Sequence, residues 1–182
     1  MNPHQLTTLL NSLPATHAGH ARQAQPAIIN QRFWQWTMLA QALAPALLSR
    51  NRRIVAISGS QGSGKSTLAR ILVKQLHALG KTAACVSLDD FYLPKQARAK
   101  LAQEVHPLLA TRGVPGTHDS SRLRHLLEQF GSNNGLVTVD LPAFDKGLDD
   151  RVADIQVQAE LLVVEGWCLG VQPEDAASLQ HP

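Results

Sequence analysis

The chain has 182 residues, enough for one domain with a substantial core, and its 17 basic and 14 acidic side chains leave a net charge of +3. The basic residues are scattered and aromatic residues make up only 4%, which argues against a surface that stacks nucleic-acid bases. Two cysteines without a close partner in sequence favour a reducing compartment, and no apolar run approaches the ~20 residues that span a bilayer. We therefore expect a cytoplasmic protein that binds neither nucleic acid nor a membrane, and the sequence does not indicate its oligomeric state.

The N-terminal part, residues 1–50, is predicted to be a helical extension. A short helix is expected over 4–12, and His17 and His20, which lack a third ligand nearby in sequence, are interpreted as facing solvent. Apolar residues then recur at helical intervals from Ile28 to Leu48. This spacing predicts an amphipathic helix, with Pro45 as the point where it could kink or be interrupted.

A strand, a glycine-rich turn and a helix follow one another directly after this extension. The run Ile54–Ser58 is short, apolar and rich in β-branched residues, as a buried parallel strand is. The next segment, Gly59–Thr67, fits the pattern G-x-x-x-x-G-K-[ST] of the phosphate-binding loop in nucleotide-using proteins. Apolar residues at helical spacing from Leu68 to Leu79, ended by Gly80, complete the structural context that this motif requires.

The residue types of this loop predict how it would bind the phosphates of ATP. The glycines allow backbone angles barred to other residues, so that successive N–H groups form a nest for an anion at the positive end of the following helix. Lys65 is expected to reach the β- and γ-phosphates, and the Ser66 hydroxyl to ligate Mg²⁺. The predicted nucleotide-binding residues are Gly59, Ser60, Gln61, Gly62, Ser63, Gly64, Lys65, Ser66 and Thr67.

Strands and helices alternate along the rest of the chain. A buried strand is predicted over Ala83–Leu88 and a charged helix over 95–106. A loop rich in Gly and Pro over 111–119 leads to another helix, and further strands are predicted over Leu136–Asp140 and Leu161–Val164. The alternation predicts an α/β fold of the P-loop NTPase type over residues 51–182, with a mainly parallel sheet of four strands flanked by helices.

Carboxylates follow two of these strands at the edge where ligands collect in parallel sheets. Glu165 ends the last strand and is expected to bind Mg²⁺ directly or through water, although a solvent-facing glutamate would give the same pattern. Asp89 and Asp90 follow the second strand, where they could also form a solvated turn or cap a helix. Phosphoryl transfer to an alcohol needs a base that orients the hydroxyl, and Asp89 is our candidate, with Asp90 facing the other side of an extended chain and helping with metal or substrate.

Four further segments make the chain resemble one family of kinases. The segment SLDDFYLP at 87–94 is similar to the region after the second strand in the phosphoribulokinase/uridine kinase group of P-loop kinases. The segments TRGVPGTHD at 111–119, LPAFDKG at 141–147 with DDR at 149–151, and VEGWCLG at 164–170 resemble D-glycerate 3-kinase of the plant and fungal type, which has bacterial relatives. The similarity extends from about residue 54 to residue 170. It implies ATP-dependent phosphorylation of the 3-hydroxyl group of D-glycerate, with Asp89 in the position of the catalytic aspartate.

Basic residues in the loops that ATP does not need support an acidic substrate, because Arg and Lys donors bind a small carboxylate and a neutral nucleoside would not need them. The alternative is that these residues form ordinary ion pairs with the aspartates of the same loops, Asp119, Asp145, Asp149 and Asp150. The predicted substrate-binding residues are Asp90, Tyr92, Arg112, His118, Asp145, Lys146 and Arg151.

The resemblance ends at Gly170, whereas the family continues with a basic lid helix and later strands, so the chain is expected to be truncated at its C-terminus. Two alternatives to a glycerate kinase therefore stay open. One is a related kinase that acts on uridine, pantothenate or ribulose 5-phosphate. The other is a nucleotide-binding module without catalysis, because a lid excludes water from the transferred phosphoryl group.

Overall fold

The computed structural model describes residues 26–172 and Asp175, so the predicted helix over 4–12 and both His17 and His20 lie outside the described residues. The chain divides into two compact units, Met1–Trp36 and Thr37–Pro182, and the boundary falls inside helix α2 (Pro26–Ser49). The helix predicted from Ile28 to Leu48 is present as α2, and Pro45 does not interrupt it. Among the described helices, none is long and apolar enough to cross a membrane.

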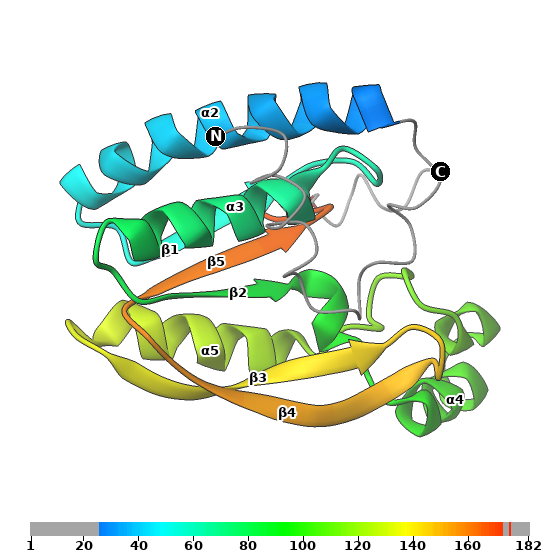
Figure 1. The fold of residues 1–182 in the computed structure, drawn as a ribbon. Coiled ribbons are helices and arrows are strands. Elements are labelled where there is room, and N and C mark those ends of the chain that lie inside the picture. The colour runs from blue at the N-terminus through cyan, green and yellow to red at the C-terminus, as the bar shows by residue number, and fades with distance from the viewer. Residues whose placement is uncertain (1–25, 173–174, 176–182) are drawn as a thin grey trace. The chain divides into compact units, whose positions relative to one another are not determined.

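Three parallel strands form the central sheet of the second unit (Figure 1). They are β1 (Ile54–Ser58), β2 (Ala83–Ser87) and β5 (Leu161–Gly166), in the order β1-β5-β2. All six residues of β5 are buried, because a central parallel strand has neighbours at both edges and is covered on both faces. The predicted α/β fold with a parallel sheet and a phosphate loop after its first strand is confirmed.

The strand predicted at Leu136–Asp140 does not belong to this parallel sheet. It is longer, β3 (Val137–Asp145), and pairs antiparallel with β4 (Asp150–Ala159), which the sequence did not predict. Its register shifts between Leu141 and Ala143, around Pro142, which has no N–H to donate to the ladder. The strand therefore continues past Pro142 to Asp145, beyond the predicted end at Asp140.

Helices and short turns connect these strands. Helix α3 (Lys65–Ala78) follows the phosphate loop, and a 3₁₀ turn, η3 (Leu88–Phe91), follows β2. Helix α4 (Lys95–Glu104), the turn η4 (Pro107–Ala110) and helix α5 (Ser120–Ser132) come before the β3–β4 hairpin. The two helices that the sequence predicted in this part, over 95–106 and after residue 119, are both present.

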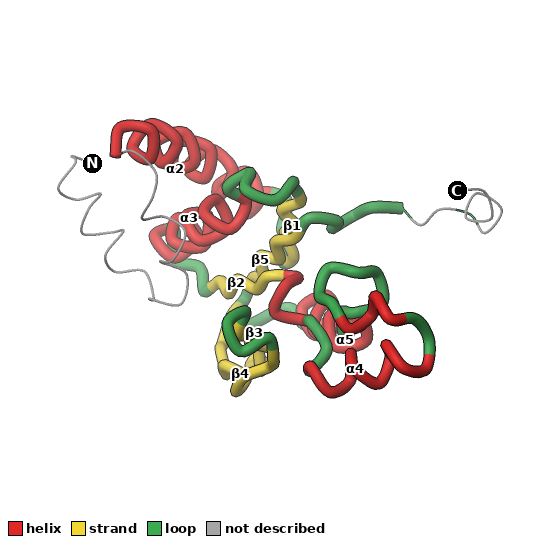
Figure 2. The backbone as a smooth tube through the Cα atoms, turned by 90° about the vertical axis from the view of Figure 1, so that its right-hand side faces the viewer, coloured by secondary structure: helices red, strands yellow, loops and turns green. Residues whose placement is uncertain are grey.

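The core lies between the parallel sheet, helix α5 and the β3–β4 hairpin (Figure 2). It joins alternate residues of β2 and β5 to α5, where Phe130 is fully buried. Helix α3 covers the opposite face of the sheet with a buried apolar stripe. This packing fixes both carboxylate-bearing strand ends, and with them the edge on which the predicted site lies.

Candidate functional site

The phosphate loop connects β1 to α3 in the conformation that its glycines predict. Gly62 and Gly64 have positive φ angles of 76° and 88°, in the left-handed region that favours glycine. Gly64 is the N-cap of α3 and offers no side-chain acceptor, so it leaves the first N–H groups of the helix open to an anion. The loop is also tied to the neighbouring strand, since the Gly59 N–H donates to the Gly166 carbonyl at 3.2 Å.

The two predicted Mg²⁺ ligands, Ser66 and Glu165, lie within hydrogen-bond distance of each other. The Ser66 hydroxyl donates to Oε1 of Glu165 at 2.9 Å. The Glu165 side chain is buried, with the residue 5% exposed, and its Oε2 has no hydrogen-bond partner among the described residues. A buried carboxylate oxygen without a partner is unfavourable, and a cation would satisfy it.

This pair fits Mg²⁺ better than it fits a metal held by protein alone. Within residues 26–172 no group of three or more His, Cys, Asp or Glu side chains could hold a metal ion. Mg²⁺ in nucleotide-using proteins usually keeps several waters and takes only one or two protein oxygens besides the phosphates. One hydroxyl and one carboxylate beside a phosphate loop are that donor set.

The acidic segment after β2 is a 3₁₀ turn rather than the extended chain that the sequence reasoning assumed for Asp90. The Ser87 hydroxyl accepts from the Asp89 N–H at 3.2 Å, and Oδ2 of Asp90 accepts from the Ser87 N–H at 3.0 Å. Asp90 thus closes a capping box, the helix-cap alternative that the sequence left open. Burial raises the pKa of Asp90 to about 6 against two backbone hydrogen bonds, and the nearby carboxylates of Asp89 and Glu165 add to the rise.

Gly166 explains how the acidic turn approaches the last strand so closely. A Cβ atom at this position would lie 2.8 Å from the Cβ of Leu88 and 3.1 Å from Cγ of Leu169. Only glycine leaves room for η3 against the end of β5. Two neighbouring residues thus serve the site: Glu165 supplies a buried carboxylate, and Gly166 leaves room for the acidic turn beside it.

Asp89 lies among several of the predicted substrate-binding residues. Nζ of Lys146 contacts its Oδ2 at 2.6 Å. Burial and the neighbouring charge of Asp89 raise the pKa of Tyr92. The His118 ring stacks on Tyr92 with 4.1 Å between centroids, burial lowers its pKa, and its buried Nε2 has no hydrogen-bond partner among the described residues. The structure thus brings together residues from three separate segments of the chain.

The predicted arginines form ion pairs with loop aspartates, as the alternative interpretation expected. Arg112 contacts Asp149 at 3.2 Å and also donates to the Lys146 carbonyl at 3.3 Å. Arg151 contacts Asp119 at 2.9 Å and donates to the Tyr92 carbonyl at 2.9 Å, so it joins β4 to the start of α5. Arg151 is therefore occupied by structural contacts, whereas Arg112 contacts Lys146, the residue that reaches Asp89.

Asp145 shapes the hairpin turn that presents Lys146. Its Oδ1 accepts from the N–H groups of Gly147 at 2.7 Å and Leu148 at 3.0 Å. A carboxylate that binds the backbone two and three residues later is a common way to fix a turn. In this structure, Asp145 organises the turn and Lys146 is the residue that reaches Asp89.

Sequence reasoning missed Arg98 and did not foresee its pairing with Asp149, which was named only as a possible ion-pair partner of the loop residues. Arg98 lies in α4, which was predicted as an ordinary charged helix, yet its side chain is only 1% exposed and is paired with Asp149. No periodic signal reveals this burial, because it depends on carbonyl groups from distant loops. Asp149 did carry a signal, since it is the first residue of the motif DDR at 149–151.

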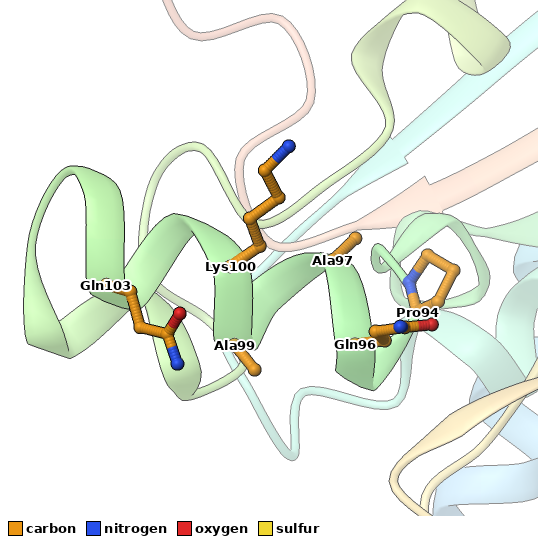
Figure 3. A pocket seen from close by; sticks show the side chains of 6 residues that line it. All are labelled: Pro94, Gln96, Ala97, Ala99, Lys100 and Gln103. Atoms are coloured by element: carbon orange, nitrogen blue, oxygen red, sulfur yellow. The ribbon is translucent and has the colours of Figure 1, made fainter.

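A shallow surface hollow beside α4 does not coincide with this group of residues. Figure 3 shows it over one side of α4, where none of the lining residues belongs to the phosphate loop or to η3. It is lined by Pro94, Gln96, Ala97, Ala99, Lys100 and Gln103. The candidate site is therefore defined by the conformation of the phosphate loop and by the charged contacts around Asp89, and the hollow lies outside it.

Comparison with known proteins adds a family and several relatives. Residues 48–152 match the family model described as "AAA domain". "Uncharacterized kinase mug58" of Schizosaccharomyces pombe is 37% identical over 140 residues, which are 69% of this chain and 50% of that protein. "D-glycerate 3-kinase, chloroplastic" of Arabidopsis thaliana is 30% identical over 133 residues, which are 66% of this chain and 29% of that protein.

A solved structure shows the same arrangement. "D-glycerate 3-kinase" from Cryptococcus neoformans superposes with a TM-score of 0.54 at 28% identity, over 86% of this chain and 57% of that one. The chain thus spans about half the length of the first of its curated relatives. The resemblance to D-glycerate 3-kinase that the sequence motifs indicated is confirmed by these relatives.

Proposed function

The chain belongs to the AAA domain family, and from this premise we propose that it transfers the terminal phosphoryl group of ATP to a hydroxyl group of a small organic acid. The substrate we favour is D-glycerate, with 3-phosphoglycerate as the product. One observation carries the proposal: the Ser66 hydroxyl meets the buried Glu165, whose second oxygen lacks a partner among the described residues, next to an open helix N-terminus.

The residues of the chain divide the work between phosphate and acceptor. The loop amides and Lys65 hold the phosphates, and Ser66 and Glu165 would hold Mg²⁺. When bound, Mg²⁺ neutralises charge on the phosphate oxygens. Asp89 takes the proton of the acceptor hydroxyl, and it follows β2 at the same sheet edge, since Ser87 and Ile57 both align with Glu165.

The charges around Asp89 support an anionic substrate. Two basic side chains with exposed surface belong to the ion-paired network at Asp89: Lys146 pairs with Asp89, and Arg112 pairs with Asp149 and donates to the Lys146 carbonyl. Lys146 is the more accessible of the two, with 63% of its side chain exposed. A carboxylate beside the reacting hydroxyl would find its donors here. Uridine carries no anionic group, whereas pantothenate carries a carboxylate and ribulose 5-phosphate a phosphate, so these two remain the closer competitors.

The test is a coupled assay of ADP release by the 182-residue protein with ATP and Mg²⁺. D-glycerate is compared with uridine, pantothenate and ribulose 5-phosphate at equal concentration. We expect release that depends on D-glycerate and falls at least ~100-fold in Lys65→Ala and Asp89→Asn. The matched control is Lys81→Ala, which removes a surface lysine paired with Glu160 and should leave the rate unchanged. Equal rates with D-glycerate and uridine, or full activity of Asp89→Asn, would refute the proposal.

A second function, nucleotide binding without transfer, would use the same open helix N-terminus and the same Ser66–Glu165 pair. Calorimetry separates the two. ATP binding that is lost in Lys65→Ala, without ADP release for any of the four acceptors, would support the binding module and reject the kinase.

A further inference from the structure

We infer that the buried Arg98 positions Lys146 beside Asp89, where the acceptor would bind. It acts through Asp149, Arg112 and the hairpin turn that carries Lys146. The inference rests on the proposed function only for its kinetic consequence. Its structural part concerns how a turn between β3 and β4 is held against η3, and this part can be tested without catalysis.

Arg98 is anchored far more firmly than an arginine in a surface helix. Its guanidinium donates to the carbonyls of Leu93 at 3.1 Å, Ala110 at 2.9 Å and Asp149 at 2.7 Å. It also forms an ion pair with Oδ2 of Asp149 at 3.0 Å. A buried guanidinium is stable only when its donors are satisfied, and these contacts occupy most of them. Arg98 thereby joins α4, the end of η4 and the hairpin turn.

A continuous series of contacts leads from Arg98 to the proposed base. Asp149 holds Arg98 through Oδ2 and Arg112 through Oδ1, which lies 3.2 Å from Nε of Arg112. Arg112 donates to the Lys146 carbonyl at 3.3 Å, and Nζ of Lys146 reaches Asp89 at 2.6 Å. The series crosses four segments that are distant in sequence. The position of the Lys146 ammonium group therefore depends on a charge buried in α4.

The hairpin turn needs such an anchor, because most of it is exposed. Residues 145–148 are all exposed, and Asp149 adopts a positive φ of 57°, which is unusual for a residue other than glycine. Both arginines also lie over the Phe144 ring, with guanidinium carbons 5.8 Å and 5.4 Å from its centroid. Arg98 and Arg112 thus contact the hairpin at two points, the Asp149 carboxylate and the Phe144 ring, and tie it to α4 and to the loop that carries Arg112.

Asp149→Asn tests the series most directly. Asparagine tolerates a positive φ nearly as well as any residue except glycine, so the turn should keep its backbone while both arginines lose their shared carboxylate. The matched control is Asp154→Asn, which removes another aspartate–arginine pair, that with Arg122, from the same hairpin. A second variant, Arg98→Lys, keeps the buried charge but cannot reproduce the forked contacts.

Kinetics and hydrogen exchange are measured on the three variants and the wild-type protein. For Asp149→Asn and Arg98→Lys we expect the KM for D-glycerate to rise about 10-fold while the KM for ATP stays within about two-fold, since the phosphate loop is untouched. Amide exchange should quicken at Gly147 and Leu148, which donate to Asp145, and should not change in the phosphate loop. Asp154→Asn should match the wild-type protein in each measurement.

Each result decides the inference. An unchanged KM for D-glycerate in Asp149→Asn, or an equal rise in Asp154→Asn, would overturn it, and so would a parallel loss of affinity for both substrates. If the wild-type protein turns over no acceptor, the proposed function fails while the exchange measurement still decides the positioning role. In that case faster exchange confined to the turn in Asp149→Asn would support it, and unchanged protection there would reject it.

Discussion

Replacing Asp90 by asparagine should remove a pH dependence of folding stability that the wild-type protein shows in mildly acidic solution. Burial raises the pKa of Asp90 from 3.8 to about 6 in the folded protein. The folded state therefore binds a proton that the unfolded state releases between these two pH values. Stability from this group is greatest below pH 3.8 and is lost as the pH rises through about 6.

The magnitude follows from the pKa difference. Since one pKa unit corresponds to about 1.4 kcal/mol, moving the pKa of Asp90 from 3.8 to about 6 amounts to ~3 kcal/mol between the acidic and neutral limits. Asparagine keeps an oxygen that can accept from the Ser87 N–H, and any fixed cost of the substitution is the same at every pH. The change with pH in the difference between the two proteins isolates the titration.

The assay is urea unfolding of the wild-type protein and Asp90→Asn at a series of pH values from 4 to 8. We expect the free energy of unfolding of the wild-type protein, taken relative to the variant, to fall by roughly 2–3 kcal/mol over this range, somewhat less than the full difference because pH 4 already lies above the pKa of the unfolded chain. Asp154→Asn, which alters an exposed pair with Arg122, serves as the control and should give a nearly constant difference. A constant difference for Asp90→Asn, or one that rises with pH, would show that Asp90 is not held as a buried acid.

Three further predictions concern the packing around the site. Gly166→Ala places a Cβ atom 2.8 Å from that of Leu88, so we expect a loss of about 1–3 kcal/mol in urea unfolding and weaker ADP release; wild-type stability would contradict the contact. Burial raises the pKa of Cys85 to about 12, so iodoacetamide at pH 8 should alkylate it only after denaturation. Rapid alkylation of Cys85 in the native protein, detected by peptide mapping, would contradict this. Phe130→Ala removes a fully buried ring from the core and should cost about 3–5 kcal/mol in the same unfolding assay, with a change under 1 kcal/mol arguing against the described packing.

The contact between Lys146 and Asp89 bears on how the proposed base could be regulated by substrate. In this structure the ammonium group lies 2.6 Å from the carboxylate, although 63% of the lysine side chain is exposed. An exposed ion pair contributes little to stability, so a substrate carboxylate could take over Lys146 at small cost. The same residue would then bind the acid and leave Asp89 to the hydroxyl group.

The nucleotide-binding half of the candidate site could be predicted from local patterns in the chain. Strand β1, the glycine loop and helix α3 are adjacent along the chain, and local rules of spacing and backbone freedom govern them. The same rules identified Glu165 at the end of a buried strand, because continuous apolar residues followed by a carboxylate need no distant partner to be recognised. The family motifs added Asp89 and the residues near it.

The acceptor-binding half of the candidate site, around Asp89 and Lys146, depends on contacts that form only when the chain has folded. The antiparallel pairing of β3 with β4, across a bulge at Pro142, could not be read from a short apolar run that fits a parallel strand equally well. The burial of Arg98 and its pairing with Asp149 depend on groups up to about fifty residues apart, and an arginine in a polar helix looks the same whether it is exposed or buried. Local sequence fixes the backbone conformation of adjacent residues, whereas charges find their partners only after the chain has packed.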